Sequence, residues 1–208
     1  MKSLLLVPVV GLGLAAARPA LSTDAAPLPA DAWKVDPVHS SVLFKIKHAN
    51  ASWFYGMFPG VSGTVALDAA KPEAGKIEIA IDAASVDTRN ADRDKHLRGP
   101  DFFDAKQFPE IKFVSKKITK DGDGFAVAGE MTMRGETKPL SIKVMKTGEG
   151  EFYGKRQGYE TTFTIKRSDF GMTYGVAEKV LGDEITVMAG IEGVQPEKGE
   201  KGEKGEKK

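Results

Sequence analysis

The feature that most constrains this chain is an alternation of apolar and polar residues with a period of two. Successive side chains of a β-strand point to opposite faces of a sheet, so this period is typical of a strand with one buried face. The stretch SVLFKIKH, for example, places Val42, Phe44 and Ile46 on one face. Segments of this kind predict eight strands, at residues 40–48, 63–67, 76–82, 110–118, 125–133, 139–145, 160–167 and 183–191.

Turn signals separate several of these segments. The sequence DGDG at 121–124 is typical of a β-hairpin, and RGET at 134–137 is turn-like. Eight half-buried antiparallel strands must also protect their edges. Closing the sheet into a barrel does so and leaves room for one small ligand. We therefore predict a mainly all-β fold, an eight-stranded antiparallel barrel.

A charged stretch, NADRDKHLRGP, interrupts the alternation. Its acids precede its bases, and Gly99 and Pro100 end it. This is the charge order that a helix dipole favours, followed by residues that terminate helices. We expect a short helical insertion near residues 89–106, of one or two helices. Phe102 and Phe103 are expected to plug the mouth of the barrel.

The two ends of the chain differ from the rest. Lys2 and an apolar run from Leu4 to Ala17 are typical of a secretory signal peptide. The alternative is a transmembrane helix. Such a helix needs about 20 apolar residues, and the run from Leu4 to Ala17 is shorter than that. We predict a signal peptide within residues 1–26, cleaved between 17 and 26, a linker to residue 31, a folded domain at 32–193, and a disordered Gly-Glu-Lys tail at 194–208. The protein is expected to be exported, periplasmic or secreted.

Composition excludes several kinds of chemistry. The chain has no cysteine, which rules out disulfides, thiolate metal sites and a catalytic thiol. Its 30 Lys and Arg nearly balance 29 Asp and Glu, so nothing predicts nucleic-acid binding. His39 and His48 lie nine positions apart, which in one extended strand places them on opposite faces. The two histidines are therefore not expected to bind the same metal ion. GVSGT around Ser62 lacks the final glycine of a nucleophile elbow. We predict no metal site, no cofactor and no catalytic residue.

Five blocks of the sequence, taken in order, resemble the YceI-like family of exported polyisoprenoid-binding proteins. They are WKVDPVHSSVLFKIKH, GMFPGVSGTVALD, IDAASVDTRNADRDKHLRGPDFFDAKQFPEIKFVSKKI, VAGEMTMRGETKPLSIKV and IKRSDFGM. The resemblance spans about residues 32–192. It implies a lipocalin-like barrel that holds a long isoprenoid chain or an isoprenoid quinone for transport or storage, and it implies no catalysis.

This reading places the ligand in the barrel interior. The residues expected to contact it are Phe44, Ile46, His48, Val65, Phe102, Phe103, Phe113, Met131, Met133, Ile142, Phe163, Ile165, Val187 and Ala189. The partner is an isoprenoid lipid, and transient membrane contact and a homodimer are both compatible with this role. Two alternatives stay open at this point. One is an enzyme acting on a lipid or isoprenoid substrate, through His48 or Arg167. The other is a stress-related binding module for another amphiphile.

Overall fold

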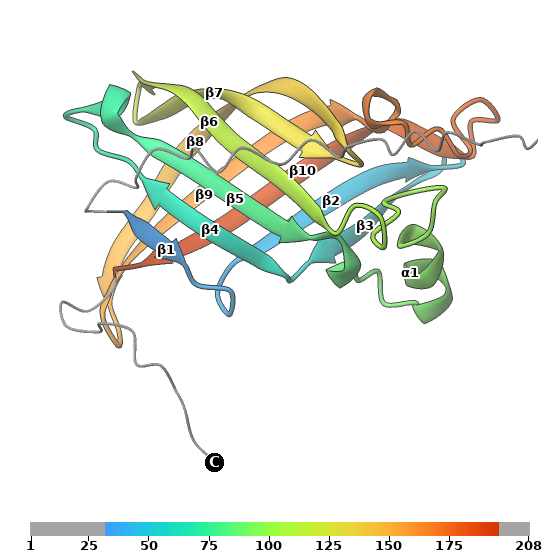
Figure 1. Ribbon diagram of the computed structural model, residues 1–208, viewed down its shortest axis with the longest axis horizontal. Coiled ribbons are helices and arrows are strands. Elements are labelled where there is room, and N and C mark those ends of the chain that lie inside the picture. Colours follow the sequence, from blue (N-terminus) through green and yellow to red (C-terminus); the bar gives the residue numbers. More distant parts are fainter. Residues whose placement is uncertain (1–31, 196–208) are drawn as a thin grey trace, which may run out of the picture.

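The computed structural model describes residues 32–195 (Figure 1). The predicted signal peptide, the linker to residue 31 and the tail beyond residue 195 lie outside these residues. None of the helices in the described part of the chain has the length and hydrophobicity needed to span a membrane.

The described residues form one antiparallel sheet that closes on itself (Figure 1). Its strands are β1 (Trp33–Val35), β2 (Ser41–His48), β3 (Ser52–Phe58), β4 (Val61–Ala66), β5 (Lys76–Asp82), β6 (Glu110–Asp121), β7 (Gly124–Met133), β8 (Glu136–Glu151), β9 (Lys155–Lys166) and β10 (Leu181–Val194). Their order is β1-β4-β5-β6-β7-β8-β9-β10-β2-β3, and β1 also pairs with β10.

Ten strands occupy eight positions around this ring. β1 and β2 pair with successive parts of β10 and so share one position. β4 pairs with β1, β3 pairs with β2, and these two partners share the next position. The predicted eight-stranded antiparallel barrel is therefore confirmed, with two of its positions each divided into two strands.

β3 was not among the predicted strands, and its side chains explain why. Trp53 and Tyr55 point outward and are about half exposed, while Phe54 and Phe58 lie on the opposite face. Both faces are aromatic, so the polarity of the sequence does not alternate even though the backbone is extended. Neighbouring β2 does alternate, and it was predicted.

The strand faces otherwise follow the sequence pattern. In β7, Val127, Gly129, Met131 and Met133 are buried, and the residues that alternate with them point outward. The predicted hairpin turn at 121–124 joins β6 to β7, and Gly122 adopts the left-handed φ of 60° that such a turn requires. RGET at 134–137 joins β7 to β8. Hydrophobic alternation and turn chemistry thus agree along this part of the chain.

The predicted helical insertion is one α-helix, α1 (Ala91–Leu97), near one end of the barrel (Figure 1). The Asn90 side chain caps it by accepting a hydrogen bond from the amide of Arg93. Buried Asp94 accepts bonds from the amide and the hydroxyl of Thr88. The residues after Gly99 form turns instead of a second helix. Three 3₁₀ turns complete the secondary structure of residues 32–195: η1 (Pro72–Ala74), η2 (Ala83–Ser85) and η3 (Arg167–Phe170).

Two arginines fasten the segment that follows α1. Arg98 donates to the carbonyls of Ala84 and Val86, at 2.7 and 2.9 Å. Arg134, in the β7–β8 turn, donates to the carbonyls of Pro100 and Phe102. Because charged donors make the stronger hydrogen bonds, the irregular segment carrying the two phenylalanines is held firmly over the barrel end.

Candidate functional site

The barrel encloses an apolar cavity of about 1100 Å³, part of which is open to solvent. Every strand except β1 contributes to its wall. Most of the residues that line it are inward-facing residues of the strands, joined by Phe103 from the segment after α1 and Met172 from the β9–β10 connection.

The accessible surface of this wall is entirely apolar. Such a cavity binds a ligand by removing its hydrocarbon from water, at about 25 cal/mol for each Å² buried. It offers no cluster of acids, bases or nucleophiles to a bound molecule. The cavity wall is therefore suited to contact with hydrocarbon.

A glycine in β3 makes room for one of the wall residues, Phe44. A Cβ atom at Gly56 would lie 2.3 Å from Cζ of Phe44 on the neighbouring strand. Glycine at this place in β3 leaves free the space that the Phe44 ring occupies. With any other residue the ring would have to move.

Two hydroxyl groups lie on one wall, both on β9. Tyr159 is buried, and its hydroxyl donates to the side-chain oxygen of Gln157. Burial, with a smaller contribution from the Glu149 charge, raises the pKa of the Tyr159 phenol, so the phenol stays protonated. Two residues further on, the buried Oγ1 of Thr161 has no hydrogen-bond partner in the described part of the protein.

The two phenylalanines of the insertion have different surroundings. Phe103 lines the cavity and meets Phe58 edge-on, with ring centroids 5.2 Å apart. Phe102 is also buried, but it packs between His96 and Tyr174 outside the cavity. The expectation that at least one ring faces the interior is met by Phe103 alone.

Most of the predicted contact residues line the cavity. They are Phe44, Val65, Phe103, Phe113, Met131, Met133, Ile142, Phe163, Ile165, Val187 and Ala189. Three do not. Ile46 is buried but lies beyond the cavity wall, and Phe102 packs as described above. His48, expected to be a core histidine, is exposed, because β2 ends there and the barrel no longer covers its inner face.

The cavity wall also contains residues that were not among the predicted contacts. Several belong to faces that the alternation already placed inward, and these are Ile77, Ile79, Ile81, Ile111, Leu140, Val144, Ile185 and Ile191. Phe58 belongs to the unpredicted β3, and Tyr159 precedes the predicted segment at 160–167. Met172 lies in a loop, where no periodic signal exists.

Arg167, one of two residues considered for catalysis, is almost completely buried. Its guanidinium donates to the carbonyls of Gly182, Met172, Tyr174 and Leu181. Desolvation lowers the pKa of this group, while the nearby Asp183 opposes the shift. These four bonds hold the loop between η3 and β10 in place, so the side chain has a structural task and is turned away from the cavity.

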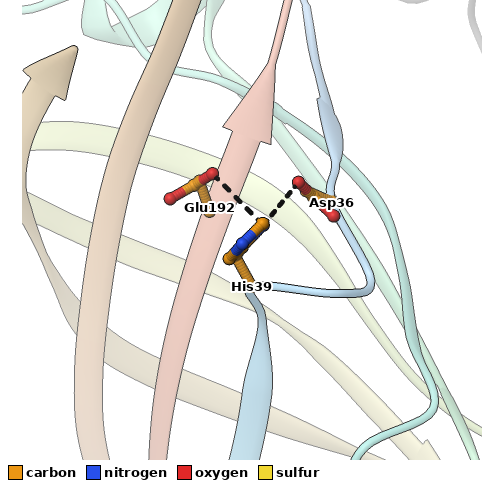
Figure 2. Close-up of side chains that lie close together, drawn as sticks. All are labelled: Asp36, His39 and Glu192. Atoms are coloured by element: carbon orange, nitrogen blue, oxygen red, sulfur yellow. Dashed lines mark hydrogen bonds and ion pairs between the residues drawn. The ribbon is translucent and has the colours of Figure 1, made fainter. Parts of the chain in front are cut away.

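A cluster of ionisable groups lies elsewhere, where the β1–β2 connection meets β10 (Figure 2). His39 Nδ1 lies 2.9 Å from Asp36 Oδ2 and 3.8 Å from Glu192 Oε1. Arg156 binds both carboxylates, and its Nη1 is 2.7 Å from Asp36. The hydrogen bonds from His39 and Arg156 hold the pKa of Asp36 well below its usual range. A metal ion would have to compete with the guanidinium for both carboxylates, so the arrangement is better suited to joining strands.

Comparison with known proteins gives a consistent result. The YceI-like domain matches residues 33–193. A UPF0312 protein of Yersinia pestis is 38% identical over 159 residues, which are 76% of this chain and 82% of that protein. The crystal structure of Burkholderia cenocepacia BcnA has a TM-score of 0.70 at 28% identity, covering 76% of this chain and 98% of BcnA.

A more distant structure shares the fold. A domain of Saccharophagus degradans, described as a polyisoprenoid binding domain implicated in plant cell wall breakdown, has a TM-score of 0.60. It is 15% identical and covers 80% of this chain and 99% of that domain. Together with the barrel and its cavity, the match over residues 33–193 establishes that the chain belongs to the YceI-like family.

Proposed function

We propose that this is an exported lipid-binding protein that holds a long isoprenoid chain, or an isoprenoid quinone, inside the barrel for transport or storage. The observation that carries the proposal is the apolar cavity, which is lined from nearly every strand and lies in one continuous barrel. The distant structure named as a polyisoprenoid binding domain supports the same ligand class. The apolar run near the N-terminus supports export.

Physical chemistry favours a hydrocarbon chain as the guest. Each CH₂ group buried contributes about 0.8 kcal/mol, so a five-carbon isoprene unit gives roughly 3–4 kcal/mol before the cost of ordering it. Met131 and Met133 add flexible wall atoms that adapt to the shape of a guest. Neither candidate for enzymatic action supports catalysis, because His48 is outside the cavity and Arg167 is committed to backbone carbonyls.

Extraction of the freshly purified protein with organic solvent, followed by mass spectrometry, tests the proposal. We expect a prenyl chain in the extract, and restored binding when the delipidated protein is titrated with a prenyl alcohol. Protein that yields no lipid and binds no prenyl compound after delipidation would contradict it. For export, the N-terminus of secreted or periplasmic material should begin between residues 18 and 27.

A further inference from the structure

Strands β8 and β9 pair along only part of their length. Their pairing runs from Glu151 with Lys155 to Val144 with Thr161 and stops there. The first half of β8, residues 136–143, pairs with β7 alone, and residues 162–166 of β9 pair with β10 alone. A seam therefore opens between β8 and β9 in the half of the barrel nearer η3.

A comparable gap lies between β5 and β6, and there the structure fills it. The pairing of these strands ends at Glu78 with Val114. Beyond that point the 3₁₀ turn η1 packs against β6, and the Ser115 hydroxyl accepts a hydrogen bond from the amide of Ile77 at 2.8 Å. The turn η3 contacts both β8 and β9, but the seam between them still holds a surface groove of about 810 Å³, which includes solvent-exposed space.

The groove adjoins the cavity, because Met131, Leu140 and Ile165 line both spaces. These three side chains separate the barrel interior from the groove, so a ligand chain that lies against them inside the barrel is next to the seam.

The chemistry of the groove differs from that of the cavity. Its walls include two cationic side chains, Lys138 and Lys166, and two anionic ones, Asp169 and Glu184. Lys138 lies on the inner face of β8, directly opposite Met131, and its Nζ is 3.3 Å from Glu136. The facing strand edges add backbone donors and acceptors that are not used in β8–β9 pairing.

We propose that this groove holds the polar head of the bound amphiphile, and that this head is an uncharged hydrogen-bonding group such as a hydroxyl or a quinone carbonyl. The inference rests on the proposed function, because it assumes an amphiphile in the cavity. The balance of two cations and two anions gives no net attraction for a phosphate, whereas Lys138 donates well to an uncharged oxygen.

Titration of the delipidated protein with three matched probes tests the chemistry of the head. The probes are a twenty-carbon prenyl alcohol, its monophosphate and the corresponding hydrocarbon. We expect the alcohol to bind roughly tenfold more tightly than the hydrocarbon, as one hydrogen bond from a charged donor predicts, and more tightly than the phosphate. Lys138→Met should remove the advantage of the alcohol over the hydrocarbon. Lys143→Met, on the outer face of the same strand and paired with Asp121, should leave it unchanged.

The outcomes separate this inference from the proposed function. If alcohol and hydrocarbon bind equally and Lys138→Met has no effect, the groove is not the head site, but the cavity still binds prenyl chains. Tightest binding of the phosphate would overturn the uncharged head. A protein that binds none of the three probes would overturn both the inference and the proposed function.

A second measurement locates the head directly and uses the absence of cysteine in the chain. Thr164→Cys places a thiol in the groove, and Thr119→Cys places one on the exposed face of β6, where it pairs with Ala126 of β7 and does not line the groove. Bound prenyl alcohol should slow maleimide modification several-fold at position 164 and leave position 119 unaffected. Equal rates with and without bound alcohol at both positions would place the head elsewhere.

Discussion

At the scale of single residues, Thr161 is the one inconsistency of the cavity wall. Its neighbours on the inner face of β9 are Tyr159, which has a partner for its hydroxyl, and Phe163, which needs none. A buried hydroxyl without a partner costs about 1–3 kcal/mol. Thr161 therefore reduces the stability of the empty protein. Its hydroxyl is a polar group in the cavity wall that makes no hydrogen bond within the described residues.

Thr161→Val is expected to raise the free energy of unfolding of the delipidated protein by about 1 kcal/mol, because it removes the unpaired hydroxyl and keeps the side-chain shape. Urea unfolding measures the change. Thr162→Val, exposed on the outer face of the same strand, is the control and should stay within about 0.5 kcal/mol of the parent protein. A loss of stability in Thr161→Val alone would mean that the hydroxyl has a partner.

Ala189 distinguishes a cavity from a packed core. It lies on the inner face of β10, opposite Val42 and Thr161, and lines the cavity. In a close-packed interior a phenyl ring at this position costs about 1–3 kcal/mol. We expect Ala189→Phe to leave the melting temperature of the delipidated protein within a few degrees of the parent, since the ring enters open space, and to reduce prenyl alcohol binding strongly. A strongly destabilised variant would show instead that this position is filled.

At the scale of elements, irregular segments complete the barrel where strands do not. The segment after α1 brings Phe103 to the cavity, and the loop held by Arg167 brings Met172. The two segments meet where Tyr174 contacts His96 and Phe102. At the β1–β2 connection, ion pairs hold the irregular segment against the barrel, because Arg156 binds both Asp36 and Glu192.

Replacing Phe102 and Phe103 one at a time distinguishes a residue that stabilises the fold from a residue that retains the ligand. Phe102→Ala should cost about 3–5 kcal/mol of stability and leave ligand dissociation unchanged, because the ring is buried outside the cavity. Phe103→Ala should cost less, since one side of its ring already faces open space, but should speed ligand release. Chemical unfolding and prenyl alcohol dissociation rates check both. Identical effects of the two variants on ligand release would contradict the different positions of the rings.

Asp36 gives a prediction with a defined dependence on pH. Its folded pKa lies below the usual 3.8, chiefly through His39 and then Arg156, so its contribution is fully present above that value and is lost as the pH falls toward the folded pKa. Asp36→Asn should lower the free energy of unfolding by about 1.5–3 kcal/mol at neutral pH. The difference from the parent protein should shrink below pH 3.8. Asp123→Asn, in the exposed β6–β7 turn, serves as control. A difference that does not change between neutral and acid pH would rule out the ionic origin.

At the scale of the whole molecule, the closed barrel limits how much hydrocarbon its interior can hold. The ring of strands closes through β1 and β10, so strand number and tilt set the width of the interior, and the side chains that line it set the space left for a guest. A hydrocarbon guest gains affinity from each unit that fits inside. Units that extend beyond the cavity remain in water and add little.

A series of prenyl alcohols of increasing length should therefore bind with affinity that rises for each added isoprene unit and then levels off. The rise reflects about 0.8 kcal/mol per buried CH₂, less the cost of ordering the chain. Dissociation constants measured by competition against one fluorescent lipid give the series. If all the alcohols, including the shortest, bind with the same affinity, the prenyl chain does not lie inside the barrel.

The sequence by itself determined most of the strand faces, the turns around residues 121–124 and 134–137, and a short helical insertion, because these depend on local periodicity and capping. It therefore placed Phe44, Met131 and Val187 inward before any contact was known. It also indicated a barrel, since eight half-buried strands need closed edges.

Only the tertiary structure decided which inward residues face open space and which are packed. Ile46 and Phe125 satisfy the same alternation as Phe44, yet neither lines the cavity, because this depends on how strands far apart in the chain meet. The same holds for β3, whose two aromatic faces carry no period, and for His48, left exposed where β2 ends. The seam between β8 and β9 is likewise invisible in the sequence, since register between strands is a property of their pairing.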